Sequence, residues 1–164
     1  MSKPGIKIEI PGHGELDLRY MVTDYTGTLS YRGVLVPDVY DQLRTLGKML
    51  DINVLTADTR GTAKEQLKGL PLQIRILKDN NHDAQKRDFA KQFDLRHVVA
   101  FGNGQNDRLL LKAVKDAGGL AVAVDNGEGC ATDALMNTHI FIVGAARALD
   151  LLIDTNFIKA TLRF

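Results

Sequence analysis

The decisive stretch of the chain is Tyr20-Met21-Val22-Thr23-Asp24-Tyr25-Thr26-Gly27-Thr28-Leu29. Its apolar start, residues 20–22, predicts a buried core strand. Asp24 then stands at the strand end, where a carboxylate can act as a nucleophile. Gly27 lets the backbone turn away sharply. Taken alone, the same residues could merely form a turn, although Asp-x-Thr-Gly-Thr occurs by chance in only about one chain in several hundred.

Strand-like and helix-like stretches alternate on both sides of this segment. Residues 6–10 and 16–22 predict a hairpin that feeds a core strand. Further strands are expected at residues 52–56, 72–77, 97–101, 120–124 and 140–143, and helices at residues 37–50, 62–68, 83–93, 106–117, 130–135 and 145–153. This alternation predicts an α/β fold with a mostly parallel sheet between two helical layers.

Length and composition favour one compact domain over residues 1–164, with residues 1–18 as an N-terminal hairpin extension. The 21 basic and 20 acidic residues nearly cancel, which gives no support for a nucleic-acid partner. Cys130 is the only cysteine, so neither an intrachain disulfide nor a cysteine-rich zinc site can form. The sequence contains no signal peptide and no apolar run of about 20 residues, so we expect a cytoplasmic protein without a membrane partner. We interpret the four histidines as structural or surface residues, because they show no metal-ligand spacing: His13, His82, His97 and His139.

Polar residues follow several of the predicted strands. Asp24 follows the first core strand, Thr56 and Asp58 follow the second, and residues 102–107 follow a later one. Ligands of parallel α/β sheets bind at the carboxyl ends of the strands, so these residues are expected to converge on one site.

The residues from Asp24 to Leu29 resemble the first motif of the haloacid dehalogenase (HAD) superfamily, and in detail the phosphorylation motif of P-type ATPases. Val-Leu-Thr-Ala-Asp at residues 54–58 is similar to the second motif, although Thr56 could equally be a helix N-cap. Phe-Gly-Asn-Gly-Gln-Asn-Asp at residues 101–107 resembles the fourth motif. The resemblance covers about residues 20–143 with the motifs in family order, and it implies a three-layer, Rossmann-like HAD fold.

Lys86 is the best candidate for the cation of the third motif. It precedes Phe89, Ala90 and Phe93 by three, four and seven residues, which places it on their apolar stripe rather than among solvated charges. A lysine there needs an anion or a route to water. Lys78 is the rival candidate.

The resemblance assigns a role to each matching residue. It implies a nucleophile, Asp24, and a catalytic group formed by Asp24, Thr26, Thr56 and Lys86. It implies phosphate binding by Gly27, Thr28, Thr56, Ala57 and Lys86. It implies Mg²⁺ as cofactor, held by Asp24, the Thr26 carbonyl, Asn103 and Asp107, since oxygen donors suit this ion.

Two positions depart from the family pattern. Thr26 stands where phosphatases of the superfamily have a second Asp that acts as general acid and base, and a hydroxyl cannot do this work near neutral pH. We therefore expect slow turnover. Asn103 stands where the family usually has a metal-binding Asp, which predicts weaker metal affinity.

The spacing of the motifs leaves no room for a substrate-covering cap domain, so a capless fold is expected. A capless site must be covered by a macromolecular substrate or by a second subunit in a homo-oligomer. The sequence thus predicts a Mg²⁺-dependent phosphohydrolase that acts on a phosphorylated small molecule or macromolecule. A non-catalytic regulatory module that binds phosphate or Mg²⁺ is the alternative. A receiver-like domain is a weaker alternative, because residues 6–22 lack a convincing acidic pair before Asp24.

Overall fold

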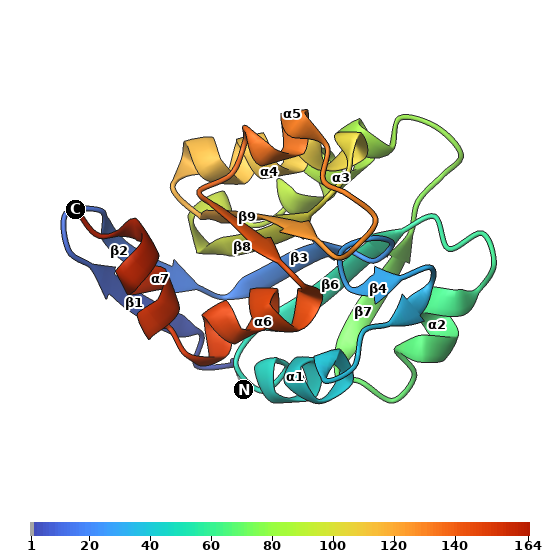
Figure 1. Ribbon diagram of the computed structural model, residues 1–164, viewed down its shortest axis with the longest axis horizontal. Helices are drawn as coiled ribbons and strands as arrows, with labels where there is room; N and C mark the ends of the chain where they lie inside the picture. The colour runs from blue at the N-terminus through green and yellow to red at the C-terminus, as the bar shows by residue number, and fades with distance from the viewer. Residues whose placement is uncertain (1) are drawn as a thin grey trace.

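A six-stranded sheet forms the centre of the computed structural model, which describes residues 2–164 (Figure 1). All five strand pairings in it are parallel. The strands, in sheet order, are β10 (Ile140–Val143), β9 (Leu120–Asp125), β8 (Val98–Gly102), β3 (Tyr20–Asp24), β6 (Asp51–Thr56) and β7 (Leu72–Ile76). The predicted α/β fold with a mostly parallel sheet is confirmed, and the boundaries of the five strands predicted after residue 50 are right to within one residue.

The first core strand along the chain, β3, lies at the centre of the sheet. Counted along the chain, the six core strands lie in the order 6-5-4-1-2-3, which is the doubly wound order with its switch point between β3 and β8. Ligands of such sheets bind in the crevice at that point. A receiver-like order, in which the first strand lies between the second and the third, is not observed.

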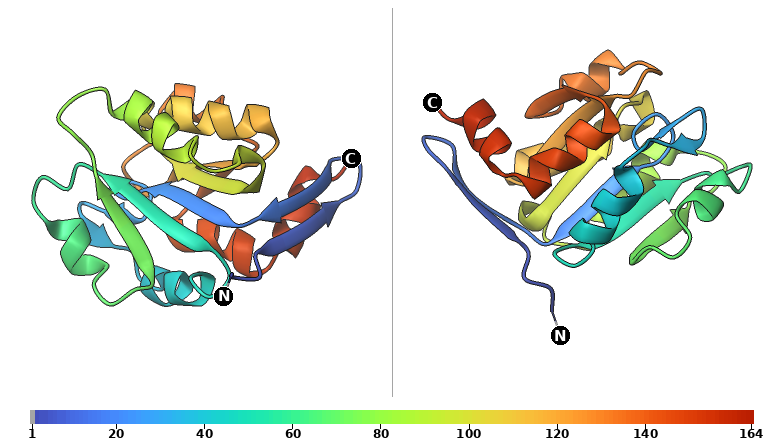
Figure 2. Two further views of the ribbon diagram at one scale, coloured as in Figure 1. Left: turned by 180° about the vertical axis from the view of Figure 1, so that it is seen from behind. Right: turned by 60° about the horizontal axis from the view of Figure 1, so that its bottom comes forward.

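Helices cover both faces of the sheet, as the two views in Figure 2 show. On one face, α1 (Val39–Leu46) and α6 (Ala145–Ile153) pack on alternate strand residues such as Ile52, Val99 and Val122. On the other, α3 (His82–Ala90) and α4 (Arg108–Ala117) cover the smaller side chains of Ala100 and Ala121. Because residues of the inner strands β8 and β9 are buried from both sides, these strands are almost continuously apolar, whereas the edge strand β7 alternates apolar and polar residues.

Two elements at the ends of the chain lie together beside the sheet. The predicted N-terminal hairpin is present as β1 (Ile6–Ile10) and β2 (Gly14–Leu18), and the last helix, α7 (Asn156–Leu162), packs against it (Figure 2). The prediction of one strand over residues 16–22 was wrong, because the strand is interrupted at Arg19, where β2 leaves for the hairpin and β3 joins the central sheet. The α7 helix was missed, since its single buried residue, Ile158, gives no amphipathic period.

The segments between the motifs are short. Between β3 and β6 lie α1 and a small hairpin of β4 (Ser30–Tyr31) and β5 (Val34–Leu35), which we did not predict. Between β6 and α3 lie α2 (Thr62–Gln66) and β7. Two 3₁₀ turns, Leu95–His97 and Gln105–Asp107, and α5 (Thr132–Leu135) complete the described chain. Neither intermotif segment holds a cap domain, so the fold is capless as expected.

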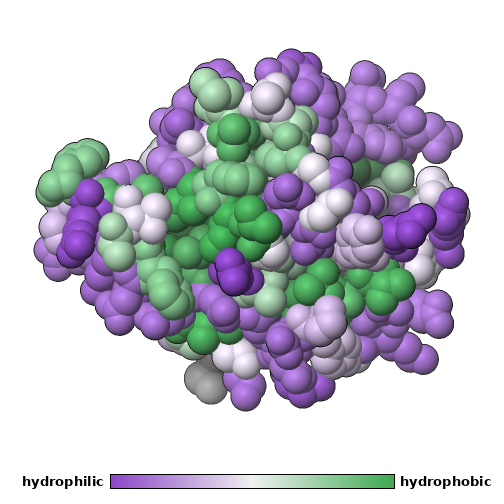
Figure 3. Space-filling view, in the orientation of Figure 1, coloured by the Kyte–Doolittle hydropathy of each residue, from purple (hydrophilic) through white to green (hydrophobic). Residues whose placement is uncertain are grey.

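The edge strand β10 exposes apolar side chains. Phe141 is 47% exposed and Val143 is 56% exposed. Figure 3 shows apolar surface in the middle of the view, where Figure 1 places this strand. Within residues 2–164, no helix is both long and apolar enough to cross a membrane.

His139 is a structural histidine, as the sequence predicted. Its Nδ1 accepts a hydrogen bond of 3.1 Å from the backbone N–H of Ala121, which requires an unprotonated Nδ1. Burial, assisted by Lys115 and His13, lowers the pKa of His139 from 6.5 to about 4.

We therefore expect His139 to make the fold acid-sensitive. Between pH 6.5 and about 4 the unfolded chain binds a proton that the folded chain does not, so stability is complete above this window and falls as the pH is lowered through it. Urea unfolding at about pH 7.5 and about pH 4.5 should show a larger loss of free energy in wild type than in His139→Asn, whose amide oxygen still accepts the Ala121 N–H. Equal losses would contradict this assignment.

Candidate active site

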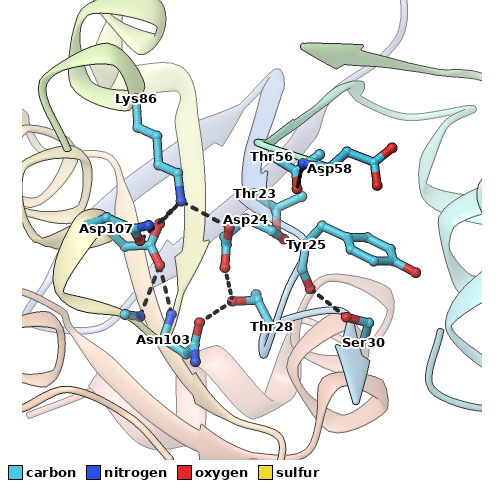
Figure 4. A network of polar contacts seen from close by, with 12 residues as sticks. Thr23, Asp24, Tyr25, Thr28, Ser30, Thr56, Asp58, Lys86, Asn103 and Asp107 are labelled. Atoms are coloured by element: carbon cyan, nitrogen blue, oxygen red, sulfur yellow. Dashed lines mark hydrogen bonds and ion pairs between the residues drawn. The ribbon is translucent and has the colours of Figure 1, made fainter. Parts of the chain in front are cut away.

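Asp24 is the last residue of the central strand β3, at the switch point of the sheet, and it is 7% exposed. Figure 4 shows its carboxylate between the Lys86 amine and the Thr28 hydroxyl, with Asn103 on the far side of Thr28. Burial is the main cause that raises the pKa of Asp24 to about 6, with a further contribution from Asp107 and opposition from Lys86. The carboxyl group is therefore ionised at neutral pH, although less readily than an exposed aspartate.

Lys86 joins two carboxylates in the interior. Its Nζ lies 2.9 Å from Asp24 Oδ1 and 2.7 Å from Asp107 Oδ1, and its side chain is 1% exposed. Burial alone would lower the pKa of Lys86, but the two carboxylates raise it above its ordinary value, so the lysine stays charged. Lys86 is thus the buried cation that the sequence predicted. The rival, Lys78, is exposed and lies before α3.

Asp107 holds the glycine-rich loop in place. Its Oδ2 accepts hydrogen bonds of 3.0 Å from the backbone N–H groups of both Asn103 and Gly104, while Oδ1 contacts Lys86. Gly102 is required here, because a Cβ at this position would lie 2.5 Å from the Asp107 side chain. Both carboxylate oxygens of Asp107 therefore already accept hydrogen bonds from the protein. The role of Asp107 as a metal ligand stays a prediction.

Thr28 connects the first motif to the fourth. Its Oγ1 lies 3.3 Å from Asp24 Oδ2 and 3.2 Å from Asn103 Oδ1, and a single hydroxyl proton can serve only one of them at a time. The Asn103 amide nitrogen donates to the Gly129 carbonyl at 3.3 Å, which turns the amide oxygen towards Thr28. Gly27 has φ 76°, and a Cβ there would lie 2.4 Å from the Asn103 amide nitrogen. A glycine is thus required at this position for both conformation and space.

Thr56 lies at the end of β6, next to β3, and is 4% exposed. Its Oγ1 accepts the Asp58 backbone N–H at 3.2 Å, so its own proton is free to point elsewhere. The helix-capping role belongs to Asp58, whose carboxylate accepts the N–H groups of Ala63 at 2.8 Å and Lys64 at 3.2 Å at the start of α2.

These residues open onto a common cavity of about 800 Å³. Its lining includes all of the predicted catalytic residues: Asp24, Thr26, Thr56 and Lys86. Ala57 and Asn103 also line it, whereas Gly27, Thr28 and Asp107 lie behind this surface. The exposed side chain of Thr26 projects at the mouth rather than packing into the core.

Sequence reasoning missed one part of this cavity. The turn of the β4–β5 hairpin contributes Arg32 and Gly33, and the loop after β6 contributes Arg60. Arg-Gly between Tyr31 and Val34 is a two-residue turn with strand-forming neighbours, so the hairpin could have been recognised. Its position over the site could not, because that depends on a hydrogen bond of 2.9 Å from the Tyr25 hydroxyl to the Gly33 carbonyl.

The donor atoms that face one another at this end of the sheet suit a hard cation. Asp24 Oδ2 and Asn103 Oδ1 lie on either side of the Thr28 hydroxyl, and both are oxygen atoms of the kind that Mg²⁺ prefers. No cluster of three or more His, Cys, Asp or Glu side chains in the described part of the chain could hold a metal. The donors present are oxygen atoms, which suit a hard divalent cation rather than zinc, whose sites use cysteine and histidine.

No protein-family model matches the chain. Among curated proteins, it is similar to MJ0073 of Methanocaldococcus jannaschii, a protein described as uncharacterized. The two are 34% identical over 76 residues, which cover 46% of this chain and 77% of MJ0073.

Several solved structures are similar to the chain. A Streptomyces avermitilis protein assigned to the HAD family hydrolases is 17% identical, with a TM-score of 0.62 over 83% of this chain and 84% of that one. The cobalt-bound deoxy-D-mannose-octulosonate 8-phosphate phosphatase of Haemophilus influenzae is 14% identical, with a TM-score of 0.64 over 90% and 94%. The 3-deoxy-D-manno-octulosonate 8-phosphate phosphatase of Moraxella catarrhalis, in complex with a magnesium ion, a phosphate ion and KDO, is 16% identical, with a TM-score of 0.58 over 86% and 90%. At these identities the likeness is one of fold, and the finer resemblance to P-type ATPases rests on the motifs alone. The chain therefore belongs to one family with MJ0073 and adopts the fold of the haloacid dehalogenase superfamily.

Proposed function

We propose that the chain is a Mg²⁺-dependent phosphohydrolase that acts on a phosphorylated small molecule through an aspartyl phosphate on Asp24. One observation carries this proposal: a buried lysine holds one oxygen of Asp24, while the same carboxylate lines a cavity at the switch point of the sheet. Perturbed carboxylates in such a crevice are typical of catalytic groups. The phosphatases of similar fold act on a phosphorylated small molecule, which supports the substrate class.

Each residue of the proposed site has its own role in the reaction. An Asp24 carboxylate oxygen attacks the phosphorus, the bond to the alcohol oxygen breaks, and the alkoxide leaves with a proton from solvent. Water then attacks the phosphorus of the aspartyl phosphate, loses a proton to solvent, and releases inorganic phosphate and the free Asp24 carboxylate. Lys86 fixes the orientation of Asp24 through Oδ1 and offsets the negative charge of the phosphoryl group. Thr56 can donate its hydroxyl proton to a phosphoryl oxygen, since its oxygen already accepts the Asp58 N–H. Backbone groups of Gly27 and Ala57 and the Thr28 hydroxyl complete the proposed phosphate-binding set.

The residues that would hold Mg²⁺ are Asp24, the Thr26 carbonyl and Asn103, with Asp107 behind them. When bound, the ion would neutralise charge on the phosphoryl group and orient it. Asp107 supports this arrangement by fixing the backbone of residues 103 and 104.

The first prediction concerns the nucleophile. Purified protein should release phosphate from p-nitrophenyl phosphate when Mg²⁺ is present, because an ionised Asp24 can attack only when the charge of the phosphoryl group is offset. Asp24→Asn should lower the rate at least about 100-fold, and EDTA should have a similar effect. Asp41→Asn, an exposed change on α1, is the matched control and should retain the wild-type rate. Equal rates for Asp24→Asn and Asp41→Asn would refute the proposed nucleophile.

The second prediction concerns Thr26. Its exposed side chain lines the cavity but cannot transfer protons near neutral pH, so hydrolysis should be slow. Thr26→Asp should raise kcat for p-nitrophenyl phosphate by about 10²–10⁴-fold, the usual value of general acid–base catalysis. Thr26→Asn controls for shape without an ionisable group and should stay near the wild-type rate. A Thr26→Asp rate no higher than that of Thr26→Asn would show that the missing acid does not limit turnover.

A non-catalytic module that binds phosphate or Mg²⁺ is the second candidate function. The amide of Asn103 favours it, because an amide in place of a carboxylate adds no charge to the metal ligands. The Asp24→Asn comparison separates the two functions, since a binding module would show no turnover that depends on this residue. A homo-oligomer that covers the capless site is a further proposal, for which the exposed apolar side chains include Phe141 and Val143 on β10 and Tyr31 and Val34 on the β4–β5 hairpin.

A further inference from the structure

Two arginine side chains line the rim of the active-site cavity, Arg32 from the β4–β5 turn and Arg60 from the loop after β6. Neither guanidinium forms an ion pair or a hydrogen bond with any side chain or carbonyl of residues 2–164, and the single contact of Arg32 is through its backbone N–H. Five other arginines do form ion pairs: Arg19, Arg44, Arg87, Arg96 and Arg108. The two cavity arginines are therefore unengaged cations beside a proposed phosphate site.

The backbone that carries Arg32 is fixed relative to the nucleophile. Tyr25, the residue after Asp24, is 2% exposed and donates its hydroxyl to the Gly33 carbonyl at 2.9 Å. Burial, and secondly the charge of Asp58, raises the pKa of Tyr25 to about 12, so the hydroxyl keeps its proton at neutral pH. On the other side of the turn, the Arg32 N–H donates to Glu128 Oε2 at 3.3 Å. The turn is thus anchored on both sides of the cavity mouth.

The segment that carries Arg60 lies next to this turn. A Cβ on Gly33 would lie 3.8 Å from the Thr62 side chain, and the backbone N–H of Leu35 donates to the Gln66 side chain at 3.0 Å. The hairpin therefore packs on the start of α2, directly after the loop that contains Arg60. The two arginines reach the cavity from neighbouring segments. Lys86 reaches the same cavity from a different element, α3.

The acidic groups of the cavity already have partners. Lys86 holds Asp24, the backbone of α2 holds Asp58, and the Arg32 backbone contacts Glu128. Arginine side chains left free beside a cavity are typical of sites that bind carboxylate or phosphate groups, because the planar guanidinium matches both. The rim therefore offers free guanidinium donors in addition to Lys86 and Thr56, the groups proposed to hold the transferred phosphoryl group.

We propose that Arg32 and Arg60 bind a second anionic group, a carboxylate or a phosphate, on the substrate. This inference rests on the proposed phosphohydrolase function and narrows its substrate to phosphomonoesters that carry another negative charge. The hairpin and the loop then act as the specificity elements of a site that has no cap domain.

The test compares matched pairs of phosphomonoesters that differ in one anionic group. The pairs are 3-phosphoglycerate with glycerol 3-phosphate, 6-phosphogluconate with glucitol 6-phosphate, and fructose 1,6-bisphosphate with fructose 6-phosphate. We expect kcat/KM of wild type to favour the more anionic member of at least one pair by about ten-fold, which one well-placed charge pair can supply. Whether a carboxylate pair or the bisphosphate pair shows the preference identifies the anion.

The variants assign this preference to the two arginines. Arg32→Gln and Arg60→Gln should each reduce the ratio of kcat/KM within the preferred pair, and the double variant should bring it close to one. Arg163→Gln, an exposed change at the C-terminus, should keep the wild-type ratio, and thermal unfolding should show that all variants are folded. Turnover of all esters without a preference would overturn the inference and leave the proposed function standing. Absence of turnover with every ester would overturn both.

Discussion

The ion cluster of Asp24, Lys86 and Asp107 is the interaction on which the rest of the site depends. One buried lysine contacts two carboxylates that come from different strand ends, and the three groups together carry one net negative charge. Burying such a cluster has a large desolvation cost. Removal of Lys86 would leave both carboxylates without a counter-charge in the interior, and breaking a buried ion pair in this way typically costs about 3–5 kcal/mol. The cluster lies at the switch point of the sheet, where the phosphoryl group of the proposed substrate would bind.

The cluster also links local structure to the cavity. Because Asp107 accepts two backbone N–H groups, it fixes the loop that carries Asn103, and Asn103 in turn faces Thr28 and Asp24. The first and fourth motifs are thus held together by hydrogen bonds before any ligand binds. At the mouth of the cavity, the hydrogen bond from the Tyr25 hydroxyl to the Gly33 carbonyl fixes the β4–β5 turn to the same segment as Asp24. Asp24, the oxygen donors and the rim therefore form one connected structure, which is the preorganisation that the proposed phosphoryl transfer would require.

The sequence alone predicted the sheet, most of the helices and the convergence of Asp24, Thr56 and Lys86 on one cavity. These predictions depend on local patterns: apolar strands, an apolar stripe on α3 and turn-forming glycines, each of which is readable from a few neighbouring residues. The missed parts depend on contacts between distant segments. The break at Arg19 and the short α7 helix arise from packing of the hairpin on the chain end. Arg32 and Arg60 carry no local signal, because only the tertiary structure brings the hairpin turn beside the loop after β6.

The most direct test of the central claim is to detect the covalent intermediate on Asp24. Wild-type protein would be mixed with acetyl phosphate and Mg²⁺, quenched in acid and digested, and the peptides would be analysed by mass spectrometry. The account predicts a hydroxylamine-sensitive phosphate on the peptide that contains Asp24, absent when Mg²⁺ is omitted and absent from Asp24→Asn. A phosphate on another residue, or hydrolysis of acetyl phosphate without any labelled aspartate under rapid quench, would contradict it.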